Sequence, residues 1–352
     1  RLGRYDAAER MLRSAIQRHP GGAQEVESRI ELALLRSEQG RFEEAEALAR
    51  RTIAMAPHNL EAQEALGRIL TERGQYDDAV RILKPVLARR EQLPELDKRA
   101  TAASALASAH FYAGRYDESR ALNERALGLR VQVHGERHPY IAADQTNLGA
   151  IDFETGRYAQ AETHFRRALA IVETWYGPHH PETGSALTML GRCLVYQSRN
   201  AEAQPLLQRA LAIQEKVLGP AHARVASVIN DLGNIAVAAG QFGEAEVYYL
   251  RMEDIYRQTR GDAHYLVATA LSNRANVYLK KGDFARAEAI MRDVVARYTK
   301  ALSASHTNTA IARIRLGRTL SRQKRWRETV VESQAGYDLL SAQAQPAVSW
   351  LQ

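Results

Sequence analysis

The sequence predicts an all-α fold in which helical hairpins stack into a solenoid. Its main landmark is a turn glycine followed by an aromatic and a small residue, as in Gly156, Tyr158 and Ala161. Successive copies of this landmark lie 37, 34 and 40 residues apart, and then 42 residues apart five times running. Between landmarks, apolar residues recur at three- and four-residue steps, which is the period of an α-helix. A period in this range indicates stacked repeats rather than one globular core.

The same turn occurs along almost the whole chain. Its glycine stands at Gly3, Gly40, Gly74, Gly114, Gly156, Gly240 and Gly282, and weaker copies of the turn contain Ser198 and Lys324 instead. A second landmark has the same period, with histidines 42 residues apart at His138, His180, His222, His264 and His306. Two landmarks in one register argue against a chance period.

Residues 1–99 are predicted to hold repeats of shorter period. Residues 1–19 indicate the second helix of a truncated repeat, which Pro20 ends. Because the chain begins inside a repeat, we expect further residues before it. Two helix pairs follow, one around the turn at Gly40 and one around the turn at Gly74. Residues 91–98 join these repeats to the longer ones.

Residues 100–352 are predicted to hold 42-residue repeats, and we expect one continuous solenoid over both segments. In the clearest unit, residues 138–172, Pro139 stands at a first helical position, where a missing N–H is tolerated. Gly156 ends that helix in a positive-φ conformation, and an apolar stripe after it marks the second helix. The segment Gln345-Pro346-Ala347-Val348 falls 42 residues after the link at His306, which leaves room for the repeats to continue.

The composition narrows the class of protein. The net charge is +7, but 41 of the 48 basic residues are arginine, which we attribute to coding bias rather than to nucleic-acid binding. No apolar run approaches the 18 residues of a membrane span, so we expect no membrane partner. The lone Cys193 excludes an intramolecular disulfide and a cysteine zinc site. A reducing, cytoplasmic location is therefore expected.

Several positions of the 42-residue unit carry a family resemblance. Leu148, Gly149, Gly156, Tyr158, Ala161, Phe165 and Ala168 resemble the tetratricopeptide consensus. The link Gly177-Pro178-His179-His180-Pro181 resembles the 42-residue repeats of kinesin light chains. The resemblance implies a right-handed α-solenoid of tetratricopeptide helix-turn-helix repeats, with about eight helix pairs.

Catalytic and metal-binding motifs are missing from the sequence. There is no phosphate-binding glycine-rich loop, no HExxH and no Gly-x-Ser-x-Gly, so we expect neither an enzyme nor a cofactor. The histidine series cannot share a metal, because packed helices lie about 8–10 Å apart and Zn–N bonds are about 2 Å long. Each histidine precedes a helix, so we expect its ring to accept a first-turn N–H or to pack under the previous helix. Weak pH sensing is the alternative.

The resemblance also implies that the first helix of each pair lines a concave surface. Its ligand-contact positions fall on Glu27, Glu31, Glu38, Glu61, Glu64 and Glu72 in the early repeats. They fall on Thr146, Asn147, Thr188, Arg192, Asn230, Asp231, Asn234, Ser272, Asn273 and Asn276 in the middle, and on Arg315, Arg318 and Arg322, near Lys280, in the last repeat. Four aromatics, Phe111, Tyr112, Phe153 and Tyr196, also fall on the predicted inner surface.

The asparagines among these positions need a reason, because their amides compete with the helix backbone. An amide offers both donors and acceptors and can hold the main chain of a bound peptide. In kinesin light chains the matching asparagines line the cargo groove, which the resemblance carries over to Asn147, Asn230 and Asn273, but not to Met189 or Arg315. We expect these amides to have no role in folding; bonding between helices, or solvation, is the alternative.

We therefore hypothesise a non-catalytic scaffold that binds a segment of a partner protein in its concave groove. The partner-binding residues would be Asn147, Arg192, Asn230, Asn234, Asn273, Asn276, Lys280, Arg315, Arg318 and Arg322. The drift from glutamate to arginine would orient the partner, and the arginines would favour an acidic stretch. The alternative is a regulatory or sensor arm of a larger multidomain protein that carries, for example, a kinase or a peptidase. Nucleic-acid binding is disfavoured because no aromatic stacking platform accompanies the arginines.

Overall fold

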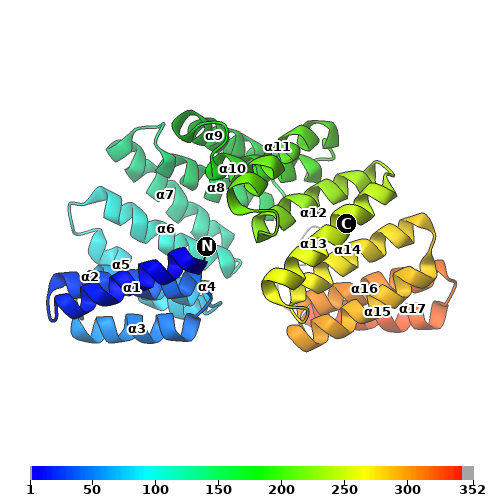
Figure 1. Ribbon diagram of the computed structural model, residues 1–352, viewed down its shortest axis with the longest axis horizontal. Coiled ribbons are helices and arrows are strands. Elements are labelled where there is room, and N and C mark those ends of the chain that lie inside the picture. The colour runs from blue at the N-terminus through cyan, green and yellow to red at the C-terminus, as the bar shows by residue number, and fades with distance from the viewer. Residues whose placement is uncertain (1, 343–352) are drawn as a thin grey trace. The chain divides into compact units, whose positions relative to one another are not determined.

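The computed structural model describes residues 2–342, and this range contains 17 α-helices and no strand (Figure 1). The helices form two compact units that divide between Thr155 and Gly156. Unit 1 comprises α1 (Leu2–Arg18), α2 (Ala23–Glu38), α3 (Phe42–Met55), α4 (Leu60–Glu72), α5 (Tyr76–Arg90), α6 (Leu96–Tyr112), α7 (Tyr116–His134) and α8 (Pro139–Glu154). Unit 2 comprises α9 (Tyr158–Tyr176), α10 (Pro181–Tyr196), α11 (Asn200–Leu218), α12 (Ala223–Ala238), α13 (Phe242–Arg260), α14 (Tyr265–Lys281), α15 (Phe284–Ala301), α16 (Thr307–Arg322) and α17 (Trp326–Ala342).

The predicted fold class, an all-α solenoid of helix-turn-helix repeats, is confirmed. α1 is a lone second helix, and the even-numbered helices from α2 to α16 are each followed by their second helix. α1 already includes Gly3, which the turn pattern had placed before a helix, because no first helix precedes it in the described chain. The change of period near residue 100 falls inside unit 1. The link expected at residues 345–348 lies outside the described residues.

The turn after each first helix requires a left-handed residue. Gly40, Gly74 and Gly114 have φ values of 76°, 86° and 75°, a region that glycine enters without a Cβ clash. In the two weaker copies of the turn, Ser198 and Lys324 take the same conformation, with φ values of 60° and 61°. The repeat therefore imposes this conformation whatever the residue, at a strain of roughly 1–2 kcal/mol for a non-glycine residue.

A glycine inside the first helix allows close contact with the second helix of the same repeat. A Cβ added at Gly191 would lie 2.6 Å from Leu207 Cγ, and one added at Gly233 would lie 2.7 Å from Tyr249 Cε1. Both distances are below any ordinary van der Waals contact, so these positions exclude every larger residue unless the helices move apart. The core of each unit is formed by these interlocked large and small side chains.

The five periodic histidines cap the N-termini of five first helices. Accepting a first-turn N–H was one of the two roles expected from the sequence. In each case the ring Nδ1 accepts the backbone N–H two residues later, at 3.0–3.2 Å. His138, His180, His222, His264 and His306 are thus the N-cap residues of α8, α10, α12, α14 and α16. Each ring satisfies a backbone donor that a helix start otherwise leaves without a partner.

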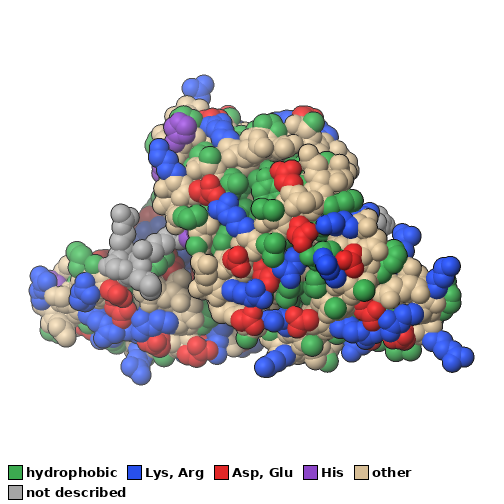
Figure 2. All heavy atoms as spheres, turned by 45° about the vertical axis from the view of Figure 1, so that its right-hand side comes forward, with side chains coloured by type: hydrophobic (Ala, Val, Ile, Leu, Met, Phe, Trp, Pro, Cys, Tyr) green, Lys and Arg blue, Asp and Glu red, His purple; other side chains and the backbone are tan. Residues whose placement is uncertain are grey.

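Outside the grooves, arginines are balanced by carboxylates of the neighbouring repeat. Arg199 pairs with Glu162 at 2.6 Å, and Arg325 pairs with Glu288 at 2.6 Å. Figure 2 shows basic and acidic side chains interspersed on the visible face rather than gathered into one basic block. Within the described chain, no helix has the length and apolar character needed to cross a bilayer.

Candidate ligand grooves on the first helices

Unit 2 contains a groove of about 310 Å³ whose lining is polar but free of acidic residues. Its walls come from α10, α12, α14 and α16, with one residue from the second helix α15. The lining residues are Tyr196, Asn230, Asn234, Thr269, Ser272, Asn273, Tyr298, Asn308, Ile311, Ala312 and Arg315. The structure therefore brings together four of the predicted partner-binding residues, Asn230, Asn234, Asn273 and Arg315.

The groove asparagines are partly engaged within the protein, which corrects the expectation that they have no role in the fold. Asn273 Nδ2 donates to Asn230 Oδ1 at 2.7 Å, which links α14 to α12. The hydroxyl of Tyr249, a 1% exposed residue, donates to Asn234 Oδ1 at 2.7 Å. The physical reason is that neighbouring first helices, and the two helices of one repeat, lie close enough for an amide to bond across them.

These bonds leave part of each amide available. An asparagine side chain has two N–H donors and an oxygen with two lone pairs. Asn234 uses its oxygen, and within residues 2–342 its Nδ2 group makes no hydrogen bond. Asn273 uses one N–H, and its oxygen makes no hydrogen bond within the same range. The two side chains can therefore still offer a donor and an acceptor to a ligand.

Arg315 places a positive charge in this groove, and no carboxylate of the described residues forms an ion pair with it. Its Nη1 donates to Ser272 Oγ at 2.8 Å, and among the described residues it forms no ion pair. Burial lowers the pKa of Arg315, because desolvation disfavours the charged form. A partly buried guanidinium without a counter-ion is a position where an incoming anion would be stabilised.

The remaining predicted residues do not line this groove. Arg192 is held by Asp231, with Nε 3.0 Å from Oδ2, and also donates to Ser227 Oγ at 2.7 Å. Arg318 donates to Asn276 Oδ1 at 2.9 Å. Lys280 and Arg322 are exposed near the ends of α14 and α16, so both belong to the outer part of this surface.

Asn147 belongs to unit 1 and to a different, smaller pocket of about 120 Å³. Its Nδ2 donates to Oδ1 of Asn123 at 3.3 Å, which links α8 to α7. Asn123 is only 3% exposed. This contact is the inter-helix bonding that was the alternative interpretation of the asparagines, and at Asn147 the alternative describes the structure.

Five groove residues of unit 2 were not predicted from the sequence, namely Thr269, Tyr298, Asn308, Ile311 and Ala312. Tyr298 comes from a second helix, and its hydroxyl lies 2.8 Å from Thr269 Oγ1. Asn308 lies in the first turn of α16, just after its histidine cap. The helix-position pattern considered only the central part of first helices, so it could not include Tyr298. A search for polar residues two positions after each histidine would have found Asn308.

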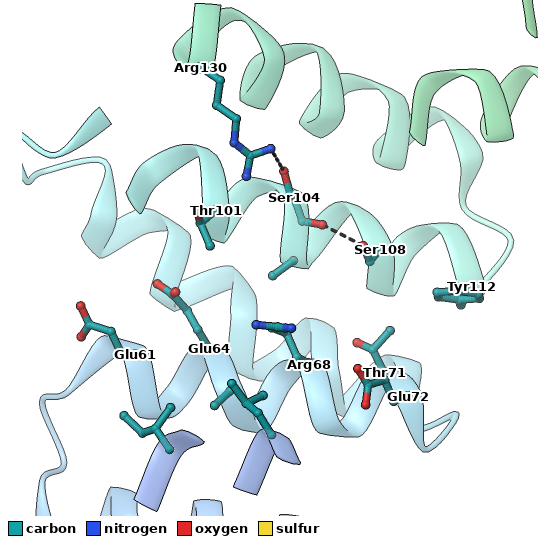
Figure 3. A pocket seen from close by; sticks show the side chains of 14 residues that line it. Glu61, Glu64, Arg68, Thr71, Glu72, Thr101, Ser104, Ser108, Tyr112 and Arg130 are labelled. Atoms are coloured by element: carbon teal, nitrogen blue, oxygen red, sulfur yellow. Dashed lines mark hydrogen bonds between the residues drawn. The ribbon is translucent and has the colours of Figure 1, made fainter. Parts of the chain in front are cut away.

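Unit 1 contains a larger groove, of about 510 Å³, between α4 and α6 (Figure 3). Glu61, Glu64, Arg68, Thr71 and Glu72 enter it from α4, and Thr101, Ser104, Ser108 and Tyr112 enter it from α6. Arg130 of α7 reaches its upper wall and donates to Ser104 Oγ at 3.1 Å. The early glutamates Glu61, Glu64 and Glu72 were predicted to face this side.

The charges of the unit 1 groove are largely neutralised by the protein itself. Arg90, 3% exposed, donates to Glu64 Oε1 at 2.7 Å and lies 3.0 Å from Glu61 Oε1. Although burial opposes it, hydrogen bonds from Lys98 and Arg90 lower the pKa of Glu61 to about 2. On the other wall, Arg130 pairs with the fully buried Asp144. This groove is larger than that of unit 2, and its buried charges have partners. Arg68 and Glu72 also line it, but both are exposed, and neither forms an ion pair among the described residues.

Neither reactive cysteine nor metal chemistry is supported by the described residues. Cys193 is buried, its thiol donates to the Tyr158 carbonyl at 3.3 Å, and burial raises its pKa to about 11. A thiol with a raised pKa is a poor nucleophile at neutral pH. In the described range, no cluster of three His, Cys, Asp or Glu side chains is arranged to hold a metal ion.

Comparison with family models assigns the repeat. A model described as tetratricopeptide repeat matches residues 59–130, 98–173, 143–216, 193–258 and 266–328. A second tetratricopeptide repeat model matches residues 1–59 and 30–84. These matches cover most of the chain, which therefore belongs to the tetratricopeptide repeat family. Proteins of this family act as interaction scaffolds and are generally non-catalytic.

Two similar solved structures, that of RapI and that of BtubC, have the same fold at low sequence identity. The apo form of RapI is 13% identical, with a TM-score of 0.65 over 80% of this chain and 97% of that chain. BtubC (BKLC) from P. vanneervenii is 17% identical, with a TM-score of 0.53 over 66% of this chain and 94% of that chain. Repeats of a putative kinesin light chain from Podosopora anserina are 25% identical, with a TM-score of 0.49 over 57% and 96%. No curated protein matches the chain.

Proposed function

We propose that this protein is a scaffold that holds a peptide segment of a partner protein in the groove of unit 2. The partner segment contains an acidic residue, whose carboxylate pairs with Arg315. The free donor of Asn234 and the free acceptor of Asn273 hold the peptide main chain on either side. Arg318, Arg322 and Lys280 extend the positive surface toward further acidic residues of the partner.

The observation that supports this proposal best is the unbalanced charge at Arg315. The groove holds this guanidinium beside amides and hydroxyls without any acidic side chain. A carboxylate placed there gains a charge-assisted hydrogen bond and relieves the desolvation of the cation. The larger groove of unit 1 is the weaker candidate, because its buried charges already have partners.

The proposal is tested by partner capture with matched variants. Asn273→Ala and Arg315→Gln together remove the acceptor and the cation, and we expect loss of a captured partner while helicity stays unchanged by circular dichroism. Asn234 is left intact, because its removal would leave the buried Tyr249 hydroxyl without an acceptor. Gln160→Ala with Gln208→Ala, two exposed positions of second helices, is the control.

Identified partners then allow a quantitative test. A synthetic peptide of the captured segment is titrated against the wild type, and each Asp or Glu is replaced in turn by Asn or Gln. One carboxylate should account for most of the effect of Arg315→Gln, so that the peptide and protein changes are not additive. Equal binding by the wild type and the double variant would show that the partner uses another surface.

A further inference from the structure

Arg68 is a cation of the unit 1 groove that the fold does not use. It projects from α4, and Figure 3 shows its guanidinium inside the groove, between the side chains of Glu64 and Glu72. Among the described residues it forms neither a hydrogen bond nor an ion pair. What such an arginine pairs with can be read from the equivalent residue of another repeat.

The equivalent arginine of unit 2 is held by the next first helix. Arg192 and Arg68 both stand six residues before the turn residue of their repeats. The Nε of Arg192 lies 3.0 Å from Asp231 Oδ2, and its Nη2 donates to Ser227 Oγ at 2.7 Å. The geometry of the repeat therefore brings an arginine at this position within reach of two positions of the following first helix.

Those two positions are occupied differently in unit 1. Counted from the turn glycine of each repeat, Asp231 and Ser227 correspond to Ala105 and Thr101 of α6. A hydroxyl is kept, but a methyl group stands in place of the carboxylate. Ala105 lines the groove of unit 1, whereas neither Arg192 nor Asp231 lines the groove of unit 2. The unit 1 groove is thus open at the position where unit 2 supplies its own carboxylate.

Arg68 can hold a carboxylate without help from a second residue. A guanidinium presents its N–H donors in a planar fork that matches the two oxygens of a carboxylate. The acidic residues toward one end of the groove, Glu61 and Glu64, compete little for Arg68, because Arg90 already pairs with both. A ligand carboxylate would therefore meet a cation that is not otherwise engaged.

Glu72 adds a preference for a positive charge in the same ligand. It follows Arg68 by one helical turn, about 6 Å along α4. Its carboxylate accepts from the Ser37 hydroxyl and forms no ion pair within residues 2–342. Glu72 would repel a purely anionic ligand but attract a cationic group placed about 6 Å from the ligand carboxylate. The two side chains together favour a ligand that carries both charges.

We propose that unit 1 contains a second ligand site, for a zwitterion whose carboxylate pairs with Arg68 and whose cationic group pairs with Glu72. The ligand carboxylate lies beside Arg68 as that of Asp231 lies beside Arg192. The two charges belong either to a free amino acid with a distant amine or to an acidic and a basic side chain of a peptide. Because exposed ion pairs are weak, the affinity is millimolar. The inference does not depend on the proposed function of unit 2.

Ligand-observed NMR with the full chain tests the proposal with a series of ω-amino acids. The charged groups of γ-aminobutyrate and 5-aminovalerate are about 5–6 Å apart when the chain is extended, so these two should bind most tightly. Glycine, whose charges are too close together, and butyrate, which has no amine, should bind about threefold more weakly or worse. An end-blocked peptide with aspartate and lysine two positions apart tests the other source. Tighter binding by the peptide assigns the site to a protein segment, and tighter binding by the amino acids assigns it to a free molecule.

Three variants separate the two charges of the site. Arg68→Gln should weaken the binding of γ-aminobutyrate about three- to fivefold, because it removes one exposed ion pair. Ala105→Asp supplies a carboxylate from within the chain, as Asp231 does for Arg192, and should abolish binding although Arg68 is still present. Glu72→Gln should remove the preference for γ-aminobutyrate over butyrate.

The control is Arg51→Gln, which removes an exposed arginine of α3 that has no ion pair within the described chain, and it should bind as the wild type does. If the wild type binds none of the probes saturably, or if Arg68→Gln binds them equally well, the proposal is wrong. Unchanged binding by Ala105→Asp would also overturn it, because the ligand would then not occupy the position of the absent carboxylate. Arg68 and Glu72 are exposed, so their variants decide the question even where Ala105→Asp does not fold.

Discussion

The first helices of the two units share one backbone design but carry opposite charge. In unit 1, α2, α4, α6 and α8 contain eleven acidic and five basic residues. In unit 2, α10, α12, α14 and α16 contain two acidic and nine basic residues. Both sets keep a small buried residue and a positive-φ turn at the same positions of the repeat. The groove-facing positions are therefore free of the constraints that hold the repeat together.

The difference also shows that the size of a groove is a poor guide to its use. The groove of unit 1 is the larger, but its Glu64 and its Arg130 are neutralised by Arg90 and Asp144. The groove of unit 2 is smaller and keeps Arg315 without a counter-ion. Buried charge that the fold has not compensated, rather than volume, distinguishes the groove in which a ligand gains most.

The largest expected effect comes from the same substitution made in each groove. Arg130→Met should destabilise the protein by about 3–5 kcal/mol, because it leaves the fully buried Asp144 carboxylate unpaired. Arg315→Met removes a cation without a carboxylate partner and should leave stability unchanged or raise it by about 1 kcal/mol. Urea unfolding monitored by circular dichroism measures both. A similar loss in both variants would mean that Arg315 also has a structural role.

A pH effect of intermediate size is expected from unit 1. Burial raises the pKa of Asp144 to about 6, despite the neighbouring Arg130. Since its pKa is raised in the folded state, Asp144 contributes stability that is complete below pH 4 and is lost as the pH rises through about 6. The loss is on the order of 2 kcal/mol. Unfolding measured from pH 4 to pH 7 should show it in the wild type and not in Asp144→Asn.

A smaller effect is expected at the turns, where the three turn glycines of unit 1 contrast with two non-glycine turns in unit 2. Ser198→Gly and Lys324→Gly should each stabilise the protein by about 0.5–1 kcal/mol, because glycine enters the positive-φ region without strain. Gly240→Ser is the reverse control and should cost a similar amount. Thermal unfolding measures the shifts. No gain in either glycine variant would indicate that the serine and lysine side chains add compensating contacts.

The smallest effect is expected at the histidine caps. His264→Ala should cost about 0.5–1 kcal/mol at neutral pH, because it removes the acceptor of the Leu266 N–H. Burial lowers the pKa of His264 in the folded state, so its contribution is present above pH 6.5 and is lost as the pH falls through the lowered value. At pH 5 the variant and the wild type should converge. His264→Asn keeps an acceptor and should stay close to the wild type at neutral pH.

Features that depend on local geometry could be predicted from the sequence. The turn after each first helix follows from a glycine and an aromatic at fixed spacing, and even Ser198 was placed in it correctly. The histidine caps follow from a ring placed just before a helix, which needs only residues two apart in the chain. The groove-facing positions of first helices came from the tetratricopeptide resemblance, and among them Asn230 and Asn273 lie in one groove.

Features that depend on contacts between repeats could not be predicted. Arg192 was expected to face a partner, but Asp231, 39 residues later in the sequence, holds its guanidinium. Tyr298 enters the groove because of the way α15 packs between its neighbours, and no pattern within α15 marks it. The bond from Asn273 to Asn230 likewise depends on the separation of two helices, which composition and period do not specify.

The histidine cap has a consequence for how such a chain can change in length. Each 42-residue segment from α8 onward carries its own initiating side chain and its own reversing turn, so neither signal is borrowed from a neighbour. Unequal recombination that duplicates or deletes a whole segment therefore leaves every remaining start and stop intact. The groove would lengthen or shorten by one repeat. Selection could then change the side chains that face the groove without changing the residues that fold the repeat.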